Sequence, residues 1–413
     1  MEILDSKPMK KHLRIFHFCP RSAYSGLEAY ALALAKSQLD QGELVTMAVM
    51  SHSPLASQAI EADVPIFKVE RTGIVRKIFD LLRLTSVLTS KSRPDVLHMH
   101  STQDLQALLV PLILSRILLF AAQTLLKINR NVLPVKSSGE GKTKIILHTH
   151  IWIKHSKKDP LHAFSYLFVD EVWCSSPQAH LQLQRVLPIH VSKIREVPYG
   201  REILKMESQL LTRANARATL QLPLESTLIG TVARIDKGKG IEELLEASIR
   251  LMDQFPDLHL VLIGAPTTDD PKAIKFAEKI NSRILSLPQS LQNRIHCLGN
   301  VPESFKYLKA LDLFVLATYL ECFALSLLEA QLAKVPCVTT NSGGSPTLVQ
   351  ENKTGWLCEP ESIGSLYSSL RRALKERERW PEFADNALTT VRSQYDFDKV
   401  SRKILALYRQ TQS

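Results

Sequence analysis

The sequence predicts two doubly wound α/β domains, each with a parallel sheet covered by helices on both faces. Apolar runs of strand length alternate with segments of helical period along nearly all of the 413 residues, as in parallel sheets. The runs are too many for one sheet of ordinary size, and the rhythm restarts near residues 200–226. We therefore expect domains 1–200 and 201–396 to face a cleft, with a helix over 397–411 crossing back to the first domain.

The expected strands are short apolar runs bounded by polar or turn residues. In the first half they lie near 12–18, 44–50, 65–69, 95–99, 144–149, 171–174 and 194–198. In the second half they lie near 227–234, 258–263, 294–298, 312–316, 336–340 and 355–358. The intervening segments have helical spacing, as where Ile241, Leu244 and Leu245 recur with Glu242 and Glu243 on the other side. The segment 397–411 is amphipathic, and no strand follows it.

The composition is that of a globular protein of the cytoplasm. Hydrophobic residues make up 45% and charged residues 23%, which is ordinary for a soluble fold. The six cysteines form no CxxC pair, so we expect neither a disulfide framework nor a zinc site. The first twenty residues lack the features of a secretory signal.

Positive charge is concentrated in the first half of the chain. Residues 1–200 hold 25 Lys and Arg against 16 Asp and Glu, a net of +9, and the remainder holds 27 against 25, a net of +2. A basic first half favours binding of an anionic partner there. The basic residues are scattered and match no nucleic-acid motif, so we expect no nucleic acid. A phosphorylated substrate and an anionic membrane surface remain as candidates for the anionic partner.

Residues 105–126 form an unusually apolar segment whose only charge is Arg116. A basic loop follows, with Lys127, Arg130, Lys136, Lys142 and Lys144. The segment is interpreted as a deeply buried crossover helix, an interfacial helix beside its basic loop, or a spanning helix, which would place Arg116 near mid-bilayer. The interfacial alternative would make the protein peripheral at the inner face of the cytoplasmic membrane.

The second half carries the strongest candidate site. In 230–240 a strand ends at Arg234, a short turn carries Lys239, and Gly240 opens a helix. Two cations at such a turn can converge on one diphosphate, aided by the helix N-terminus. A solvated charged turn is the alternative, since neither a Walker loop nor GxGxxG is present.

Two further pieces follow the next strands. In 318–330, Glu321 lies in a strand-to-helix turn and Glu329 lies about one turn inside the helix. A helical carboxylate can accept two charge-assisted hydrogen bonds from a ribose diol, while a carboxylate in the turn can hold sugar hydroxyls. The N–H groups around Phe323, Ala324 and Leu325 can meet phosphate oxygens. The alternative for 318–330 is a pair of surface glutamates. The second piece, 341–349, has a Gly-Gly turn after a strand, and its alternative is a plain tight turn.

Together these pieces resemble the retaining glycosyltransferases of family 4, group 1 type, with the GT-B fold. The family patterns are G-R-x-x-x-x-K-G, E-x-F-G-x-x-x-x-E and G-G-x-P-E. The matching residues here are Arg234, Lys239, Glu321, Phe323, Glu329, Gly343, Gly344 and Pro346. The resemblance implies two Rossmann-like domains, with the nucleotide diphosphate on Arg234 and Lys239. It assigns Glu329 to the ribose and Glu321 to the transferred sugar.

The first half also resembles this family. SAYSGLEAY is similar to the G-G-x-E pattern before a helix, so that Gly26 would let the backbone approach the donor phosphate. PDVLHMHS and KIILHTH resemble strands that aim histidines into the family's cleft. His148 is the candidate near the reacting sugar, and His100 and His150 are further candidates. For each histidine a structural role is the alternative.

The sequence departs from the family pattern at four places: Ser25, Ala324, Thr347 and the run Tyr199-Gly200-Arg201. None removes a diphosphate or ribose ligand. The only Asp-x-Asp triplet, Asp396-Phe397-Asp398, is interpreted as a helix cap, so we expect no metal and no cofactor.

The expected function is transfer of a sugar from a nucleotide diphosphate sugar to a glycan or lipid-linked acceptor, as in cell-surface polysaccharide or lipopolysaccharide synthesis. Domain 201–396 would bind the donor and domain 1–200 the acceptor. The alternatives are a GT-B sugar phosphorylase and a non-catalytic sugar-nucleotide-binding subunit.

Overall fold

The computed structural model describes residues 12–22, 26–70, 74–129, 142–268 and 270–410. The chain divides into two compact units. Unit 1 comprises Met1–Cys174, Gln182–Val197 and Ser401–Ser413, and unit 2 comprises Ser175–Leu181 and Pro198–Val400. The helices α6 (Pro177–Val186) and α16 (Phe397–Arg409) therefore contain residues of both units.

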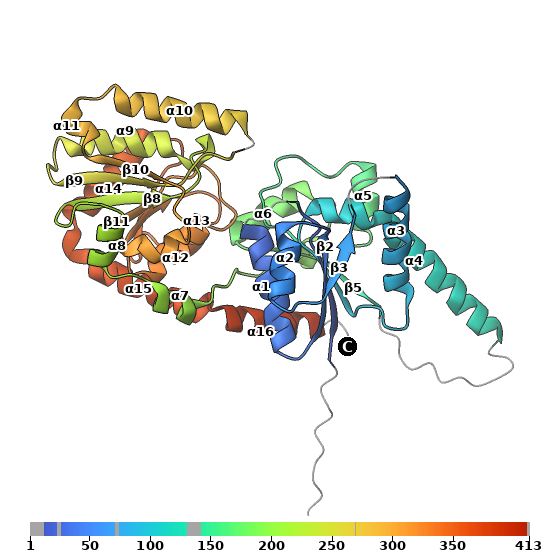
Figure 1. The fold of residues 1–413 in the computed structure, drawn as a ribbon. Coiled ribbons are helices and arrows are strands. Elements are labelled where there is room, and N and C mark those ends of the chain that lie inside the picture. Colours follow the sequence, from blue (N-terminus) through green and yellow to red (C-terminus); the bar gives the residue numbers. More distant parts are fainter. Residues whose placement is uncertain (1–11, 23–25, 71–73, 130–141, 269, 411–413) are drawn as a thin grey trace, which may run out of the picture. The chain divides into compact units, whose positions relative to one another are not determined.

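Unit 1 is built on a parallel seven-stranded sheet of order β3-β2-β1-β4-β5-β6-β7 (Figure 1). Its strands are β1 (Arg14–Phe18), β2 (Leu44–Met50), β3 (Ile66–Val69), β4 (Val96–Met99), β5 (Lys144–His148), β6 (Glu171–Cys174) and β7 (Ile194–Glu196). Its other helices are α1 (Gly26–Asp40), α2 (Pro54–Glu61), α3 (Ile74–Thr89), α4 (Thr102–Asn129) and α5 (Pro160–Tyr166). The strand order reverses between β1 and β4, where such sheets bind ligands at the carboxyl ends of the strands.

Unit 2 contains a second parallel sheet, of order β10-β9-β8-β11-β12-β13. Its strands are β8 (Thr227–Val232), β9 (Leu258–Ile263), β10 (Ile295–Gly299), β11 (Leu313–Leu316), β12 (Cys337–Thr340) and β13 (Gly355–Cys358). Its helices are α7 (Ile203–Gln209), α8 (Arg213–Thr219), α9 (Ile241–Met252), α10 (Pro271–Leu285), α11 (Gln289–Gln292), α12 (Leu325–Leu332), α13 (Ser345–Leu348), α14 (Ile363–Lys375) and α15 (Trp380–Gln394). Here the order reverses between β8 and β11.

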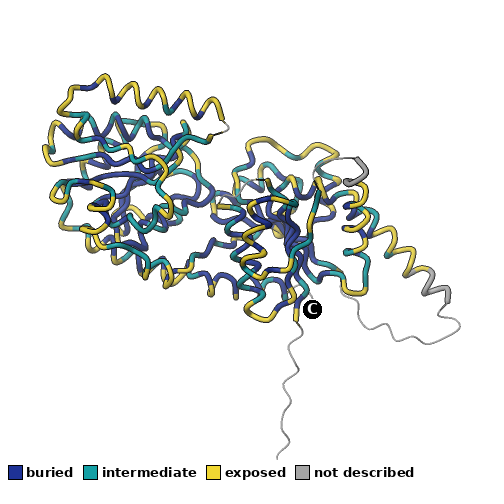
Figure 2. The backbone as a smooth tube through the Cα atoms, in the orientation of Figure 1, coloured by how far each residue is buried: buried dark blue, intermediate teal, exposed yellow. Residues whose placement is uncertain are grey.

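All the strands expected from the sequence are present, with ends shifted by at most two residues. The prediction of two doubly wound Rossmann-like domains is confirmed. The inner strands of each sheet are buried on both faces, as the dark tube through each sheet shows (Figure 2), which explains why they read as continuous apolar runs. The edge strands β3, β7 and β10 are partly exposed.

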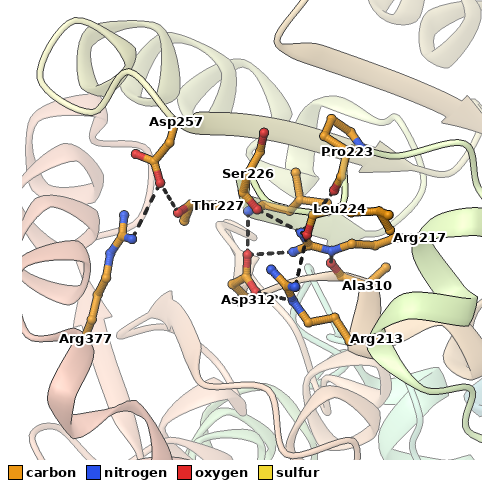
Figure 3. Close-up of polar contacts among 11 residues, drawn as sticks. Arg213, Arg217, Pro223, Leu224, Ser226, Thr227, Asp257, Ala310, Asp312 and Arg377 are labelled. Atoms are coloured by element: carbon orange, nitrogen blue, oxygen red, sulfur yellow. Dashed lines mark hydrogen bonds and ion pairs between the residues drawn. The ribbon is translucent and has the colours of Figure 1, made fainter.

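Helix α8 is fixed to the sheet of unit 2 by a buried arginine (Figure 3). Arg217 has no exposed surface. Its guanidinium donates to the carbonyl oxygens of Pro223, Leu224, Ser226 and Ala310 and to Asp312 Oδ2, at 2.7–3.0 Å. The same carboxylate oxygen accepts the Leu228 N–H at 2.8 Å. The buried charge is thus paired, and each nitrogen of the guanidinium has at least one acceptor, as burial of a charge requires.

The apolar segment 105–126 lies in α4, and burial contradicts the expectation of a deeply buried crossover helix. Among the described helices, α4 alone, over Thr102–Ala122, is long and apolar enough to cross a membrane, and 28% of its apolar window is buried. Leu105, Leu108 and Leu112 reach the core, while the later turns are exposed. The guanidinium of Arg116 lies 4.3 Å from the centre of the Phe168 ring.

The terminal helix is α16, and Asp396 caps its first turn. The Asp396 carboxylate accepts the Lys399 N–H at 3.2 Å, which confirms that the Asp-x-Asp triplet is a helix cap. The chain from Ser401 onward belongs to unit 1, where Ser401 Oγ lies 3.0 Å from Ser37 Oγ. The last residue of the helix expected over 397–411 lies outside the described part of the chain.

Candidate active site

The predicted motifs of unit 2 meet at one edge of its sheet. They occupy the loops that follow β8, β11 and β12, which are neighbours in the sheet and parallel. All three loops therefore emerge at the carboxyl ends of the strands, beside the point where the strand order reverses. This is the position at which open α/β sheets bind nucleotides.

The loop after β8 lies directly on the end of β11. The Tyr319 N–H donates to the Gly238 carbonyl at 2.9 Å, and Thr318 Oγ1 donates to it at 3.1 Å. Gly240 has a φ of +67°, and a Cβ there would lie 1.9 Å from the Ala317 carbonyl oxygen. Only glycine meets both constraints, so Gly240 is needed for Lys239 to lie over the end of β11.

The Gly-Gly turn after β12 holds the loop that carries Glu321. The Gly344 N–H donates to the Glu321 carbonyl at 2.7 Å, and Ser342 Oγ donates to the Tyr319 carbonyl at 2.6 Å. A Cβ on Gly343 or Gly344 would come within 2.2 Å of the backbone oxygen of Glu321 or Cys322. These bonds hold the third loop although Thr347 replaces the family's glutamate.

Two of the predicted charged residues are in direct contact. Lys239 Nζ lies 2.5 Å from Glu321 Oε2, with both side chains about a quarter exposed. Arg234 has other partners: its Nη1 lies 3.1 Å from Asp236 Oδ2 and 2.9 Å from Thr267 Oγ1. The structure thus unites Lys239 with Glu321, and places Arg234 on the same loop with 63% of its side chain exposed.

Glu329 has a partner that the sequence did not reveal. Arg201 Nη2 donates to Glu329 Oε1 at 2.7 Å, and the glutamate side chain is 14% exposed. Burial raises the pKa of Glu329, and the Arg201 guanidinium partly offsets that rise. Arg201, noted only as a departure from the family pattern, therefore forms an ion pair with the expected ribose ligand.

The helix N-terminus at Ala324 offers N–H groups rather than side chains. The Phe323 ring is buried, packs edge-on against the Tyr199 ring with centroids 5.1 Å apart, and lies tilted against the Tyr395 ring at 5.5 Å. No side chain of the described segments forms a capping hydrogen bond at the start of α12. The N–H groups of Phe323, Ala324 and Leu325 have no acceptor among the residues that the structure describes. Uncapped N–H groups of this kind suit an anion.

In unit 1 the predicted histidines belong to a larger cluster at the strand reversal. His17 on β1 is paired in register with His98 on β4. Because side chains alternate along a strand, His98 and His100 face the same way, as do His148 and His150. Their rings lie 4.5 Å and 4.3 Å apart, respectively. We call these five residues the histidine cluster.

Burial keeps the histidine cluster neutral. It lowers the pKa of His17 to about 4 and that of His148 to about 3. It also holds the pKa values of His98, His100 and His150 well below the usual value, with neighbouring imidazoles adding to the effect. Each ring therefore carries one N–H and one lone pair near neutral pH.

Three members of the cluster lie close enough together to hold a metal ion. The nitrogen atoms of His17, His98 and His100 are within 4.8 Å of one another. Neutral imidazoles are suitable ligands. Each of these rings, however, already contacts hydrogen-bonding partners through both nitrogens, so a metal would have to displace them.

The remaining predicted residue of unit 1 is Gly26, which opens α1 and is exposed. Ser25, which precedes it, lies outside the described residues. Sequence reasoning assigned no role to Arg201, His17, Gln38 or Tyr408. For His17 the signal was available, since RIFHF places an imidazole on a strand next to the histidines of PDVLHMHS.

The fold is that of the GT-B glycosyltransferases. A glycosyltransferase from Rickettsia africae superimposes with a TM-score of 0.80 at 17% identity, over 97% of this chain and 99% of that chain. HepE of Anabaena in complex with UDP superimposes with a TM-score of 0.77 at 16% identity, over 96% of this chain and 100% of that chain. At this identity the likeness establishes the fold.

The family match lies in unit 2. Residues 212–389 match the family "Glycosyl transferases group 1". A putative teichuronic acid biosynthesis glycosyltransferase of Bacillus subtilis, TuaC, is 30% identical over 52% of this chain and 50% of that protein. D-inositol 3-phosphate glycosyltransferase of Corynebacterium urealyticum is 26% identical over 53% and 52%. The chain spans about half the length of these relatives.

Proposed function

We propose that this protein is a retaining glycosyltransferase that moves a sugar from a nucleotide diphosphate sugar to a glycan or lipid-linked acceptor. Unit 2 binds the donor through Arg234, Lys239, Glu321 and Glu329. Unit 1 binds the acceptor, with His148 near the transferred sugar. Retention of configuration and the hexosyl nature of the donor follow from the family resemblance.

The contact between Lys239 and Glu321 carries the proposal. It joins the loops after β8 and β11 at the strand reversal, beside the uncapped start of α12. Cleavage of the donor leaves charge on the diphosphate, and cations placed there in advance stabilise the transition state. Arg234, Lys239 and the helix N-terminus supply positive charge, so we propose that the enzyme needs no metal.

We place the reaction in cell-surface polysaccharide or lipopolysaccharide synthesis, at the inner face of the cytoplasmic membrane. The name of one relative assigns it to teichuronic acid biosynthesis. The membrane part of the proposal rests on α3 and α4, which pack together. Their exposed apolar residues are Ile78, Phe79, Leu82, Val110, Ile117, Leu118 and Phe120.

Basic residues accompany this apolar surface. Arg93, Arg116 and Lys142 line a pocket between α3, α4 and β5, where they can attract anionic headgroups. Lys144, expected in the same basic loop, is instead buried on β5, 3.2 Å from Glu171. Lys127, Arg130 and Lys136 have side chains outside the described part of the structure.

The substitution Arg234→Ala tests the function. After a donor has been found by screening UDP, GDP and ADP sugars, we expect turnover to fall by about 10²–10³, as for other groups that stabilise transition-state charge. Circular dichroism should be unchanged, because the side chain is largely exposed. Arg250→Ala is the matched control, since Arg250 is an exposed arginine in the last turn of α9.

Turnover of Arg234→Ala close to that of wild type, with a verified acceptor, would contradict the assignment. So would nucleotide-sugar binding with neither hydrolysis nor transfer for any acceptor, because that result describes a binding subunit. Anomeric configuration is read from the product by NMR.

A further inference from the structure

Unit 2 contains a pocket at the opposite end of its sheet from the candidate active site. The volume of this pocket is about 460 Å³, which lies within the range of small-molecule sites. Its lining includes Leu311 and Asp312, which directly precede β11, and Val335 and Pro336, which directly precede β12. Because β11 and β12 are parallel neighbours, the pocket lies at their amino ends, whereas the motif loops follow their carboxyl ends. We call it the amino-end pocket.

The buried part of the lining is apolar. Four of the lining residues are at most 4% exposed: Leu311, Ala333, Val335 and Ala384. Trp380, at the start of α15, also lines the pocket and is half-buried. Its indole N–H already donates to the Ala373 carbonyl at 2.8 Å, and an indole has no other polar hydrogen. The ring therefore offers apolar and aromatic surface, which suits the body of an organic molecule.

One carboxylate in the lining serves two arginines. Asp312 Oδ1 lies 3.1 Å from Arg213 Nε, and Asp312 Oδ2 lies 2.7 Å from Arg217 Nη2 (Figure 3). Arg217 is fully buried, whereas the Arg213 side chain is half-exposed and lines the pocket. Since a single negative charge faces two positive charges, Arg213 retains positive charge for an occupant.

Two lysines also line the pocket, and they differ in their partners. Lys334 Nζ lies 2.7 Å from Asp385 Oδ1, so that pair carries no net charge. Lys309, in the 3₁₀ helix Ser304–Ala310, has no ion-pair partner among the residues that the structure describes. The pocket therefore has an excess of positive charge beside its apolar surface, and both features are complementary to an anion with an apolar body.

The free donors of the pocket match a carboxylate. Arg213 already uses Nε on Asp312 and Nη1 on the Leu224 carbonyl oxygen, and its Nη2 has no acceptor among the described residues. Lys309 provides the second donor. A carboxylate has two oxygen atoms that only accept hydrogen bonds, and a bond to a charged donor is stronger than one between neutral groups.

We infer that the amino-end pocket is a binding site for a small aromatic carboxylate, separate from the site that binds the donor. Arg213 and Lys309 bind the carboxylate oxygens, and Trp380 with the buried apolar residues contacts the ring. The inference does not depend on the proposed function, because the lining shares no residue with the motif loops.

NMR of protein labelled with ¹⁵N-tryptophan tests the inference. The chain has four tryptophans, so the spectrum should contain four indole signals, and Trp380→Phe identifies that of Trp380. The probes are naphthoate and naphthamide, which differ in charge and have nearly the same shape. We expect naphthoate to shift the Trp380 signal to saturation, and naphthamide to bind about tenfold more weakly because it lacks the charge. Equal affinities, or no shift with naphthoate, would overturn the inference.

Lys309→Gln removes the unpaired cation and should weaken naphthoate binding about tenfold. Lys306→Gln is the matched control, because Lys306 is in the same 3₁₀ helix, pairs with Glu303 at 2.6 Å and does not line the pocket. Its affinity for naphthoate should equal that of wild type. The same loss in both variants would show a general effect of charge and would contradict the site. If Lys309→Gln fails to fold, the comparison of the two probes still decides the result.

Three further measurements separate other occupants. Arg234→Ala should leave the Trp380 shift unchanged, and loss of the shift would mean that naphthoate occupies the donor site instead. Inorganic phosphate should bind at least tenfold more weakly than naphthoate, because it has no apolar body; equal affinity would show an adventitious ion only. Sedimentation should give the same oligomeric state with and without naphthoate. A dimer that naphthoate dissociates would assign the pocket to a second copy of the chain. Each of these contrary results would overturn the inference.

Discussion

The ion pair between Glu329 and Arg201 shows how a residue that departs from a family pattern can affect the protonation of a neighbouring carboxylate. The carboxylate is largely buried, and burial raises its pKa. The Arg201 guanidinium at 2.7 Å opposes this effect, because a nearby positive charge favours the ionised carboxylate. A buried carboxylate that loses its cation must either pay the cost of an unpaired charge or take up a proton.

We expect Arg201→Met to lower the free energy of unfolding by about 2–3 kcal/mol, because it leaves the Glu329 carboxylate unpaired. The double variant Arg201→Met with Glu329→Gln should recover most of that loss, since no charge remains. Urea unfolding at pH 7.5 measures both. Arg213→Met is the control: its partner is also a carboxylate, but the arginine is half-exposed, so the loss should be at most about 1 kcal/mol. A double variant as unstable as Arg201→Met would contradict the account.

At the scale of the element, α4 combines two environments along one helix. Its first turns contribute leucines to the core of unit 1. Its later turns expose Ile117, Leu118 and Phe120, and Phe120 is 72% exposed. Figure 1 shows α4 continuing well past the end of the sheet of unit 1. A cluster of exposed apolar residues beside cations is typical of a surface that binds a membrane interface.

We expect the protein to float with liposomes that contain anionic lipid, and to do so less with neutral liposomes. The double variant Phe79→Ser, Phe120→Ser should reduce the bound fraction several-fold, because each exposed aromatic ring that enters the interface contributes about 1.5–3 kcal/mol at most. Leu204→Ser is the control, since Leu204 is 78% exposed on α7 of unit 2. Equal flotation of all three proteins, or flotation of none, would remove the membrane contact from the proposal.

The strands and the motif loops could be predicted from sequence because their signals are local. A strand buried on both faces reads as an apolar run, and Gly240 and Gly344 are needed by backbone approaches at the strand ends. The exposure of α4 could not be predicted, because an apolar stretch does not state whether protein or another surface covers it. The contacts of Glu329 with Arg201 and of His98 with Tyr408 could not be predicted either, because each joins residues more than a hundred positions apart in the sequence.

At the scale of the whole molecule, the histidine cluster makes folding depend on pH. The unfolded chain protonates histidine near pH 6.5, whereas the folded chain keeps His17 neutral down to about pH 4 and His148 down to about pH 3. Below pH 6.5 the unfolded state therefore binds more protons, and stability falls as the pH falls. Asp104 and Glu329 act in the opposite direction, because burial raises the pKa of Asp104 to about 7 and also raises that of Glu329. Two acids against five imidazoles leave the histidines dominant.

We therefore expect the free energy of unfolding to fall steeply between pH 6.5 and pH 5, and the variant His17→Gln to remove one proton from this dependence. Near pH 5 that proton corresponds to about 1.4 kcal/mol per pH unit. Urea titrations at half-unit intervals of pH measure the slope. His155→Gln replaces an exposed histidine of the same unit and should leave the slope at its wild-type value. A slope for His17→Gln equal to that of wild type would mean that His17 is already protonated in the folded protein over this pH range, which would contradict a neutral histidine cluster.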